Sequence, residues 1–152
     1  MVTRAPTIGS LVWHLAMRWR NEVDRAVAPF GLTHAQYSVL SSLCVLTERG
    51  ERPTQRELAD FTRLQPIYIS KIVQSLESGG HIVRQPDGKD SRAVRLDPTQ
   101  AGRDTVIAAR KIVRALDDRL SRPIGGTNGA QANELRGLLA ALIDHVDQPG
   151  ER

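Results

Sequence analysis

Residues 65–95 constrain the fold of this chain more than any other stretch. The run Q-P-I-Y-I-S-K-I-V-Q-S-L-E-S has apolar residues at helical spacing on one face and polar residues on the other. The apolar set is Ile69, Ile72, Val73 and Leu76. Gly79-Gly80 supplies a left-handed helix end, and two strand-like runs, 81–84 and 93–96, then flank the turn-rich P-D-G-K-D-S. The stretch predicts a helix from Pro66 to about Ser78, followed by a β-hairpin.

A shorter helix is expected just before it. T-Q-R-E, from Thr54 to Glu57, is a capping box that starts a helix running through Phe61. The expected buried positions of this helix are Leu58, Ala59 and Phe61. The second helix then begins at Pro66, where a missing N–H costs nothing, and turns polar side chains outward. Two short helices joined by a tight turn, with a polar outer face on the second, form a helix-turn-helix pattern.

Long amphipathic helices are predicted at both ends of the chain. The first, over residues 7–29, has apolar residues at Ile8, Leu11, Val12, Leu15, Trp19, Val23, Ala26 and Val27. The capping box T-H-A-Q opens the next helix at Thr33. We expect Thr99 to cap a helix through about Leu120, and Asn128 to cap the last one. The last helix carries Leu135, Leu138, Leu139, Leu142, Ile143 and Val146. One small winged domain cannot bury all these stripes, so we expect a homodimer with these helices at the interface.

Composition limits the class of function. A chain of 152 residues, 40% hydrophobic and 25% charged, fits a globular domain. It has no apolar run of ~20 residues for a membrane span, no signal peptide, and a single cysteine, so we expect a cytoplasmic protein with no membrane partner. The net charge of +4 favours a polyanionic partner. The absence of a phosphate-cradling glycine loop, H-E-x-x-H or a nucleophile elbow argues against an enzyme.

The chain resembles the MarR family of transcriptional regulators over nearly its whole length. The resemblance rests on L-T-H-A-Q-Y-S-V-L, R-E-L-A-D, I-S-K-I-V-Q-S-L-E-S-G-G-H-I-V-R and D-G-K-D-S-R-A-V-R-L-D-P-T-Q-A-G, with the D-x-R of Asp90 and Arg92 as its most specific part. It implies a mainly α fold with a small β-wing. The winged helix-turn-helix lobe would span 32–98 and the dimerisation helices 7–30 and 99–147, within a single domain over 1–152.

The resemblance also implies a function and a binding site. The function would be sequence-specific binding of double-stranded DNA, as a homodimeric repressor of a pseudo-palindromic operator that a small-molecule effector releases. Residues 65–74 would enter the major groove, Arg92 would enter the minor groove, whose negative potential favours arginine, and Asp90 would hold the wing together. The expected DNA-contacting residues are Thr54, Gln55, Gln65, Pro66, Ile67, Tyr68, Ser70, Lys71, Gln74, Arg84, Lys89, Asp90 and Arg92. Thr54, Gln55, Ser70 and Lys71 are expected phosphate contacts.

Two parts of this interpretation stay open. Residues 66–68 are Pro-Ile-Tyr, where the family more often has smaller polar residues, so the base preference is undetermined. The effector pocket is expected to be lined by Trp13, His14, Arg18 and Tyr37, and in this family such a pocket often accepts small aromatic or phenolic acids. The alternative interpretation is that Trp13 and Trp19 are interface core.

Other interpretations of the chain are weaker. Cys44 lies on an apolar stripe and is interpreted as an inert core thiol. The four scattered histidines lack the spacing of a structural zinc site, so we expect neither a metal nor a cofactor. The rival class of function is a winged-helix protein–protein interaction module without DNA binding. The basic side chains of Lys71, Arg84, Lys89 and Arg92 argue against it, because protein-docking faces are less charged.

Overall fold

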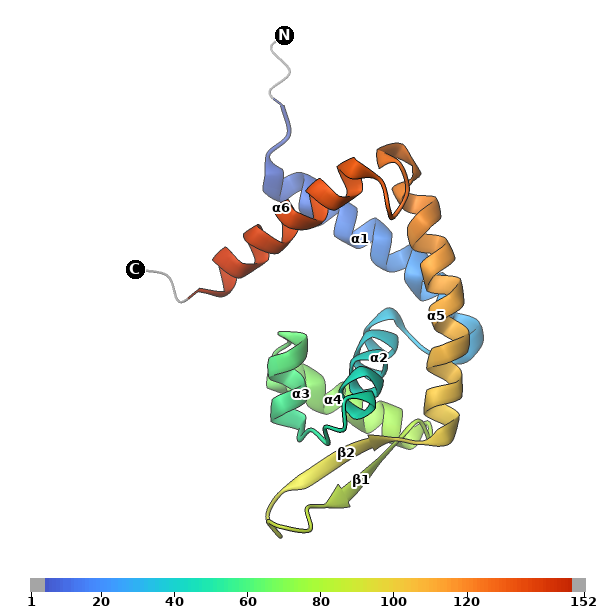
Figure 1. Cartoon of the computed structure of the whole chain (residues 1–152), viewed down its shortest axis with the longest axis vertical. Coiled ribbons are helices and arrows are strands. Elements are labelled where there is room, and N and C mark those ends of the chain that lie inside the picture. Colours follow the sequence, from blue (N-terminus) through green and yellow to red (C-terminus); the bar gives the residue numbers. More distant parts are fainter. Residues whose placement is uncertain (1–4, 149–152) are drawn as a thin grey trace. The chain divides into compact units, whose positions relative to one another are not determined.

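The computed structural model describes residues 5–148, which are mostly helical (Figure 1). In chain order the elements are α1 (Ile8–Val27), the short 3₁₀ helix η1 (Ala28–Phe30), α2 (His34–Glu48), α3 (Gln55–Thr62), α4 (Pro66–Ser78), β1 (Ile82–Pro86), β2 (Val94–Pro98), α5 (Gln100–Ser121), η2 (Arg122–Ile124) and α6 (Ala130–Asp147). This confirms the predicted fold class. Across residues 5–148, no helix has both the length and the apolar character that a membrane crossing requires.

The chain forms two compact units that divide within α5. One unit extends to Ile112 and contains α1–α4, the β-hairpin and the start of α5, and the other begins at Val113 and contains the rest of α5, η2 and α6. The winged helix-turn-helix elements therefore all lie in the first unit.

Side-chain caps start three helices of the first unit at their predicted positions. Thr33 Oγ1 accepts a hydrogen bond from the Gln36 N–H at 3.2 Å, and Gln36 Oε1 accepts from the Thr33 N–H at 2.8 Å. Thr54 and Glu57 form the same reciprocal pair at 3.2 and 2.7 Å, and Thr99 caps α5. These caps satisfy N–H groups that have no partner inside the helix. The local sequence alone therefore sets where these helices begin.

The core of the first unit is aliphatic and lies among α2, α3, α4 and the base of the hairpin. The predicted inward stripe of α4 is entirely buried. The largest fully buried side chains include Leu40, Leu43, Leu58, Ile69, Leu76, Ile82 and Leu96. Because these residues come from both helices of the helix-turn-helix and from both strands, the core fixes α4 and the wing in one rigid lobe.

Phe61 was expected to be buried, and this prediction is wrong, because 43% of its surface is exposed. With about 100° between successive residues of a helix, Leu58 and Ala59 set the inward direction of α3 and Phe61 points well to one side. The Arg49 guanidinium covers the ring instead, with its carbon 5.9 Å from the ring centroid.

The wing is an antiparallel hairpin whose register pairs Ile82 with Pro98 and Pro86 with Val94. Each strand begins one residue later and ends two residues later than the sequence predicted. Both strands therefore end on a proline. A two-stranded sheet tolerates this because each strand is an edge, so a missing N–H can face solvent.

In the second unit, the prediction that Asn128 caps the last helix is wrong. The N-cap of α6 is Gly129, which has no side-chain cap. The preceding turn is held from α5 instead, because both the N–H and the hydroxyl of Thr127 donate to Asp118 Oδ1, at 3.2 and 3.1 Å. Asp118 thus fixes the turn that leads into α6.

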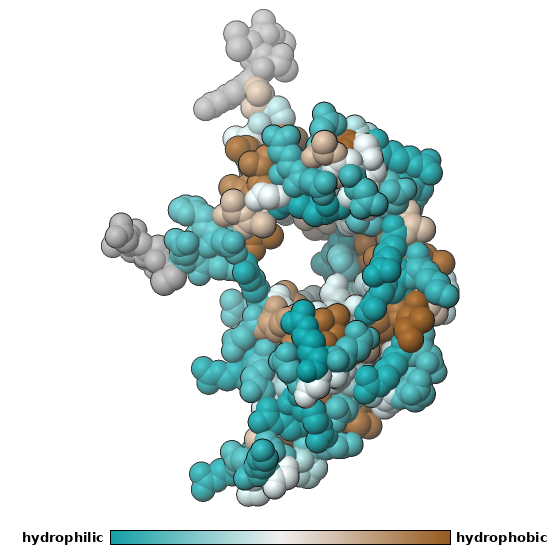
Figure 2. All heavy atoms as spheres, in the orientation of Figure 1, coloured by the Kyte–Doolittle hydropathy of each residue, from teal (hydrophilic) through white to brown (hydrophobic). Residues whose placement is uncertain are grey.

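The apolar stripes of the terminal helices are exposed in the single chain. On α6 the exposed large apolar residues are Leu135, Leu138, Leu142, Ile143 and Val146, with exposed fractions from 37% to 79%. On α1 they are Ile8, Leu11, Val12, Trp13, Leu15 and Met17. Hydrophobic surface is visible near the start of α1 in Figure 2. Exposed apolar surface of this extent marks an interaction site in soluble proteins.

Candidate nucleic-acid interface

The outer face of α4 presents Ile67, Lys71 and Gln74, all of which are exposed. They lie opposite the buried stripe, since residues spaced by three to four positions share one face of a helix. Gln65 is the N-cap, with φ −59° and ψ 136°, and Pro66 is the first helical residue. Ser70 lies at the edge of this face and is half-buried. The predicted major-groove residues thus share the exposed side of one short, rigid helix.

Tyr68 lies on the flank of α4 rather than at the centre of its outer face. It borders a cavity of about 490 Å³ that is also lined by Arg20, His34, Ala35, Ser38, Ser42, Phe61, Thr62 and Leu64. Burial lowers the pKa of His34 below its ordinary value, which favours the neutral imidazole there. Tyr68 is about 100° around the helix axis from Ile67, so it faces α2 and α3 as much as it faces outward.

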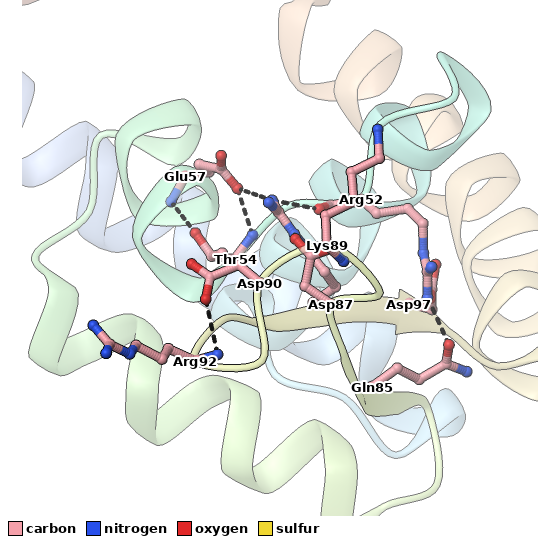
Figure 3. Close-up of polar contacts among 10 residues, drawn as sticks. Arg52, Thr54, Glu57, Gln85, Asp87, Lys89, Asp90, Arg92 and Asp97 are labelled. Carbon is pink, nitrogen blue, oxygen red and sulfur yellow. Dashed lines mark hydrogen bonds and ion pairs between the residues drawn. The ribbon is translucent and has the colours of Figure 1, made fainter.

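Arg95 of β2 fastens the wing to the start of α3. Its Nε donates to Asp87 Oδ2 at 2.8 Å, and its Nη1 donates to Glu57 Oε2 at 2.8 Å and to the Arg52 carbonyl at 3.0 Å. Glu57 Oε2 also accepts from the Thr54 N–H. The Thr54 N–H lowers the pKa of Glu57, and the Arg95 guanidinium acts in the same direction. One carboxylate oxygen therefore joins the cap of α3 to the wing (Figure 3).

Arg52, in the loop before α3, makes a second fastening at the other side of the hairpin. Its Nη2 and Nε donate to Asp97 Oδ2 at 2.5 and 3.0 Å, and Nη2 also donates to Gln85 Oε1 at 2.6 Å. The two arginines thus hold both strands against the loop that leads into the helix-turn-helix. We call the set of Arg52, Glu57, Asp87, Arg95 and Asp97 the wing clamp.

The wing tip is a tight turn built on two aspartates. Asp87 Oδ1 accepts from the Lys89 N–H at 3.0 Å, and Asp90 Oδ1 accepts from the Arg92 N–H at 2.9 Å. The Lys89 N–H lowers the pKa of Asp87, with the Arg95 guanidinium as the next cause. Asp90 therefore shapes the backbone of the tip, whereas Asp87 forms the ion pair that anchors the tip to β2.

The cations of the wing fall into two groups. Arg84 pairs with Glu77 at 3.0 Å, and Arg95 is held in the wing clamp. Within residues 5–148, the side chains of Lys89 and Arg92 take part in no ion pair and are exposed. In Figure 3 the Arg92 side chain extends away from the other labelled residues, and the wing tip forms hydrophilic surface in Figure 2. Lys89 and Arg92 are therefore the wing side chains available to an anion.

Besides Asp90, three predicted DNA-contacting side chains are hydrogen-bonded within the protein, ion-paired or turned inward. The Thr54 hydroxyl serves as a helix cap, and Arg84 is neutralised by Glu77. Gln55 is half-buried, and its side-chain oxygen is buried without a hydrogen-bond partner among residues 5–148. The carboxamide of Gln55 is therefore turned inward. These side chains are less available to an anion than those of Lys89 and Arg92.

The wing clamp is the part of the site that sequence reasoning missed. Arg95 and Asp87 come from opposite sides of the hairpin, and Arg52 and Glu57 lie in separate elements. The sequence signal that could have indicated these ion pairs was the alternation of acidic and basic residues along the hairpin. Only the three-dimensional position of the hairpin against α3 shows which of them pair.

The residues expected to line an effector pocket differ in their exposure. Trp13 and His14 contact each other edge to face, with ring centroids 4.9 Å apart, and Trp13 is 61% exposed. Arg18 is exposed on α1, whereas Tyr37 is buried on α2.

Cys44 is also buried on α2, and burial raises the pKa of its thiol. A buried thiol with a raised pKa is a poor nucleophile.

Comparison with known proteins identifies the family. A model of the MarR family matches residues 30–93. The HTH-type transcriptional regulator YdcH of Bacillus subtilis is 37% identical over 109 residues, which cover 72% of this chain and 74% of that protein. An HTH-type transcriptional regulator of Bacillus cereus is 36% identical over 154 residues, covering 98% of this chain and 95% of the relative.

Two solved structures with DNA share the fold. CouR, a transcriptional repressor bound to a 23-mer DNA duplex, has a TM-score of 0.74 and 26% identity, with 93% of each chain covered. The MepR–DNA complex of Staphylococcus aureus has a TM-score of 0.79 over 93% of this chain and 97% of that one, and its 19% identity makes it a likeness of fold alone. The similarity to the two Bacillus regulators, together with the winged lobe described above, shows that this chain belongs to the MarR family of winged helix-turn-helix transcriptional regulators.

Proposed function

We propose that this protein is a homodimeric repressor that binds a pseudo-palindromic operator in double-stranded DNA and leaves it when an effector binds. The observation that carries the proposal is the wing tip, where Lys89 and Arg92 lack an ion-pair partner within residues 5–148 while Arg84 and Arg95 have one. An unpaired cation on a fixed hairpin is suited to a phosphate or a narrow minor groove. CouR and MepR, which share the fold, have been solved with DNA.

Two surfaces of one lobe would contact DNA together. The outer face of α4, with Ile67, Lys71 and Gln74, would enter the major groove, because the second helix of a helix-turn-helix does so. Arg92 would reach the adjacent minor groove. The wing clamp would set the distance between these two contacts, since it joins the hairpin to the cap of α3.

A homodimer would place two such lobes on one DNA face. The exposed apolar stripes of α1 and α6 supply surface for an isologous interface. With two-fold symmetry, the two α4 helices would meet major grooves one helical turn apart, about 34–36 Å. The operator would then be a pseudo-palindrome. Because a protein of this function acts on the chromosome, we also propose that it is cytoplasmic. We further propose that residues 1–152 form a single MarR-type domain.

A relative supports repression, and side-chain chemistry supports an effector. A relative from Mycobacterium bovis, 25% identical over 135 residues, is an HTH-type transcriptional repressor. We retain Trp13, His14, Arg18 and Tyr37 as the proposed contacts of a small aromatic or phenolic acid, because the guanidinium of Arg18 would pair with a carboxylate. Such a ligand would release DNA only if it bound more tightly to a dimer with misplaced lobes.

The test is a binding titration with a fluorescent duplex from the region upstream of the protein's own gene, against a scrambled duplex of equal length. The proposal predicts tighter, salt-sensitive binding of the upstream duplex by two chains per duplex. Equal affinity for both duplexes, or no binding by a folded dimer, would refute it and would favour a protein–protein interaction module. Addition of salicylate-like acids to the complex tests the effector separately, with loss of anisotropy as the expected result.

A further inference from the structure

Ile67 is the most exposed large hydrophobic residue between residues 32 and 98, at 70%. An isolated exposed apolar residue is common on proteins and needs no explanation by itself. The position of Ile67 is what makes it informative. It lies in the first turn of α4, immediately after Pro66. In a helix-turn-helix, the N-terminal residues of the second helix contact the base edges.

The geometry of α4 places Ile67 at the centre of its outer face. The buried residues Ile69, Ile72, Val73 and Leu76 define the inward direction. With about 100° per residue, their mean direction is roughly opposite to that of Ile67. Lys71 and Gln74 follow Ile67 on the same face at one and two turns. Tyr68 is about 100° to the side, on the flank that borders the cavity with His34 and Phe61.

The chemistry of this face limits what it can read. The isoleucine side chain neither donates nor accepts a hydrogen bond. In the major groove, the thymine C5-methyl is the apolar group that a base pair offers, whereas the other base edges present donors and acceptors. Packing isoleucine on those polar edges would remove water without replacing its hydrogen bonds, which costs free energy. Lys71 and Gln74 on the same face supply the polar contacts around it.

We propose that Ile67 is a specificity-determining residue that reads a thymine methyl group in each operator half-site. The inference rests on the proposed DNA-binding function and names a base that the protein would recognise. It also gives the departure at residues 66–68 a role, because an apolar reading end selects thymine where polar side chains would select by hydrogen bonding. Tyr68, on the flank, takes no part in this selection.

The size of the effect follows from the surface of one methyl group. Burying one such group changes affinity about fourfold. Two symmetric half-sites would double the free energy, so removal of both methyl groups should weaken binding about fifteen-fold.

Substitution of deoxyuridine for thymidine removes the methyl group and leaves the pairing edge unchanged. We would measure the affinity of the wild-type dimer and of Ile67→Ala for the operator duplex and for its uracil form. The wild type should lose about fifteen-fold on the uracil duplex, whereas Ile67→Ala should bind both duplexes equally. Ile67→Val, which keeps a branched side chain, should retain part of the discrimination.

Gln74→Ala is the matched control, because it changes the same exposed face without removing an apolar group. It should weaken binding to both duplexes by the same factor. Equal binding of both duplexes by the wild type, or unchanged discrimination in Ile67→Ala, would overturn the inference while leaving DNA binding intact. Absence of sequence-preferring binding to the thymine duplex would instead overturn the proposed function. Circular dichroism would confirm that each exposed-site variant is folded.

Discussion

The division of the wing cations into free and paired groups predicts how salt affects DNA binding. Each phosphate that a protein cation neutralises adds about 0.9 to the slope of log affinity against log salt. Within residues 5–148, the side chains of Lys89 and Arg92 form no ion pair, so a dimer has four such cations if both wings engage DNA. The double variant Lys89→Ala/Arg92→Ala should therefore have a slope smaller by up to about 3.6. A fourfold rise in salt would then weaken the affinity of the wild type by a factor about 150 times larger than the factor for the double variant.

Arg84→Ala is the control for this prediction. Its guanidinium lies 3.0 Å from a Glu77 oxygen, so its charge is already compensated and its removal should leave the slope nearly unchanged. The assay is anisotropy of a labelled operator duplex at five salt concentrations. An equal decrease of the slope in both variants would refute the reasoning, because it would show that internal ion pairs do not decide which cations meet the phosphates.

Three further predictions concern stability and reactivity. Gly102→Ala should lower the free energy of unfolding by about 2–4 kcal/mol in chemical denaturation, because an added Cβ would lie 2.1 Å from the His81 carbonyl oxygen. Gly88→Ala is the control and should be neutral, since no described atom lies within 4 Å of the Cβ it would add. The Cys44 thiol should react with a thiol reagent only after unfolding, and rapid reaction of the native protein at neutral pH would contradict its burial. Since the folded-state pKa of Glu57 is lowered, its contribution to stability is present above the ordinary glutamate pKa and is lost as pH falls through the folded value. In thermal melts, Glu57→Gln should therefore lose less stability than the wild type loses as the pH falls below about 4.5. The same dependence of melting temperature on pH in both proteins would contradict this.

Local signals explain which features could be predicted from the sequence. The stripe of α4 follows from helical periodicity, and the caps at Thr33 and Thr54 follow from residues three positions apart. Such patterns involve neighbours within one or two turns, so they depend little on the rest of the fold. The general position of the reading helix and the wing therefore follows from the order of residues alone.

The features that the sequence could not predict depend on how elements meet. The side on which Phe61 emerges depends on how α3 packs, and the partner of Thr127 lies on the preceding helix, at Asp118. The pairing of Arg95 with Glu57 requires the hairpin to lie against α3. Composition indicated a basic protein, but only these pairings show that Arg84 and Arg95 are compensated while Arg92 has no ion-pair partner in the described part of the chain.

The most direct test of the central claim is a hydroxyl-radical footprint of the protein on the duplex from its own upstream region. Two symmetric lobes should protect two sets of nucleotides related by a two-fold axis, with centres about 10–10.5 base pairs apart. The nucleotides whose minor groove Arg92 reaches should lose protection in Arg92→Ala, while the backbone positions that flank the α4 contacts remain protected. A single asymmetric protected region, or a footprint unchanged by Arg92→Ala, would contradict the account of paired winged lobes reading one operator.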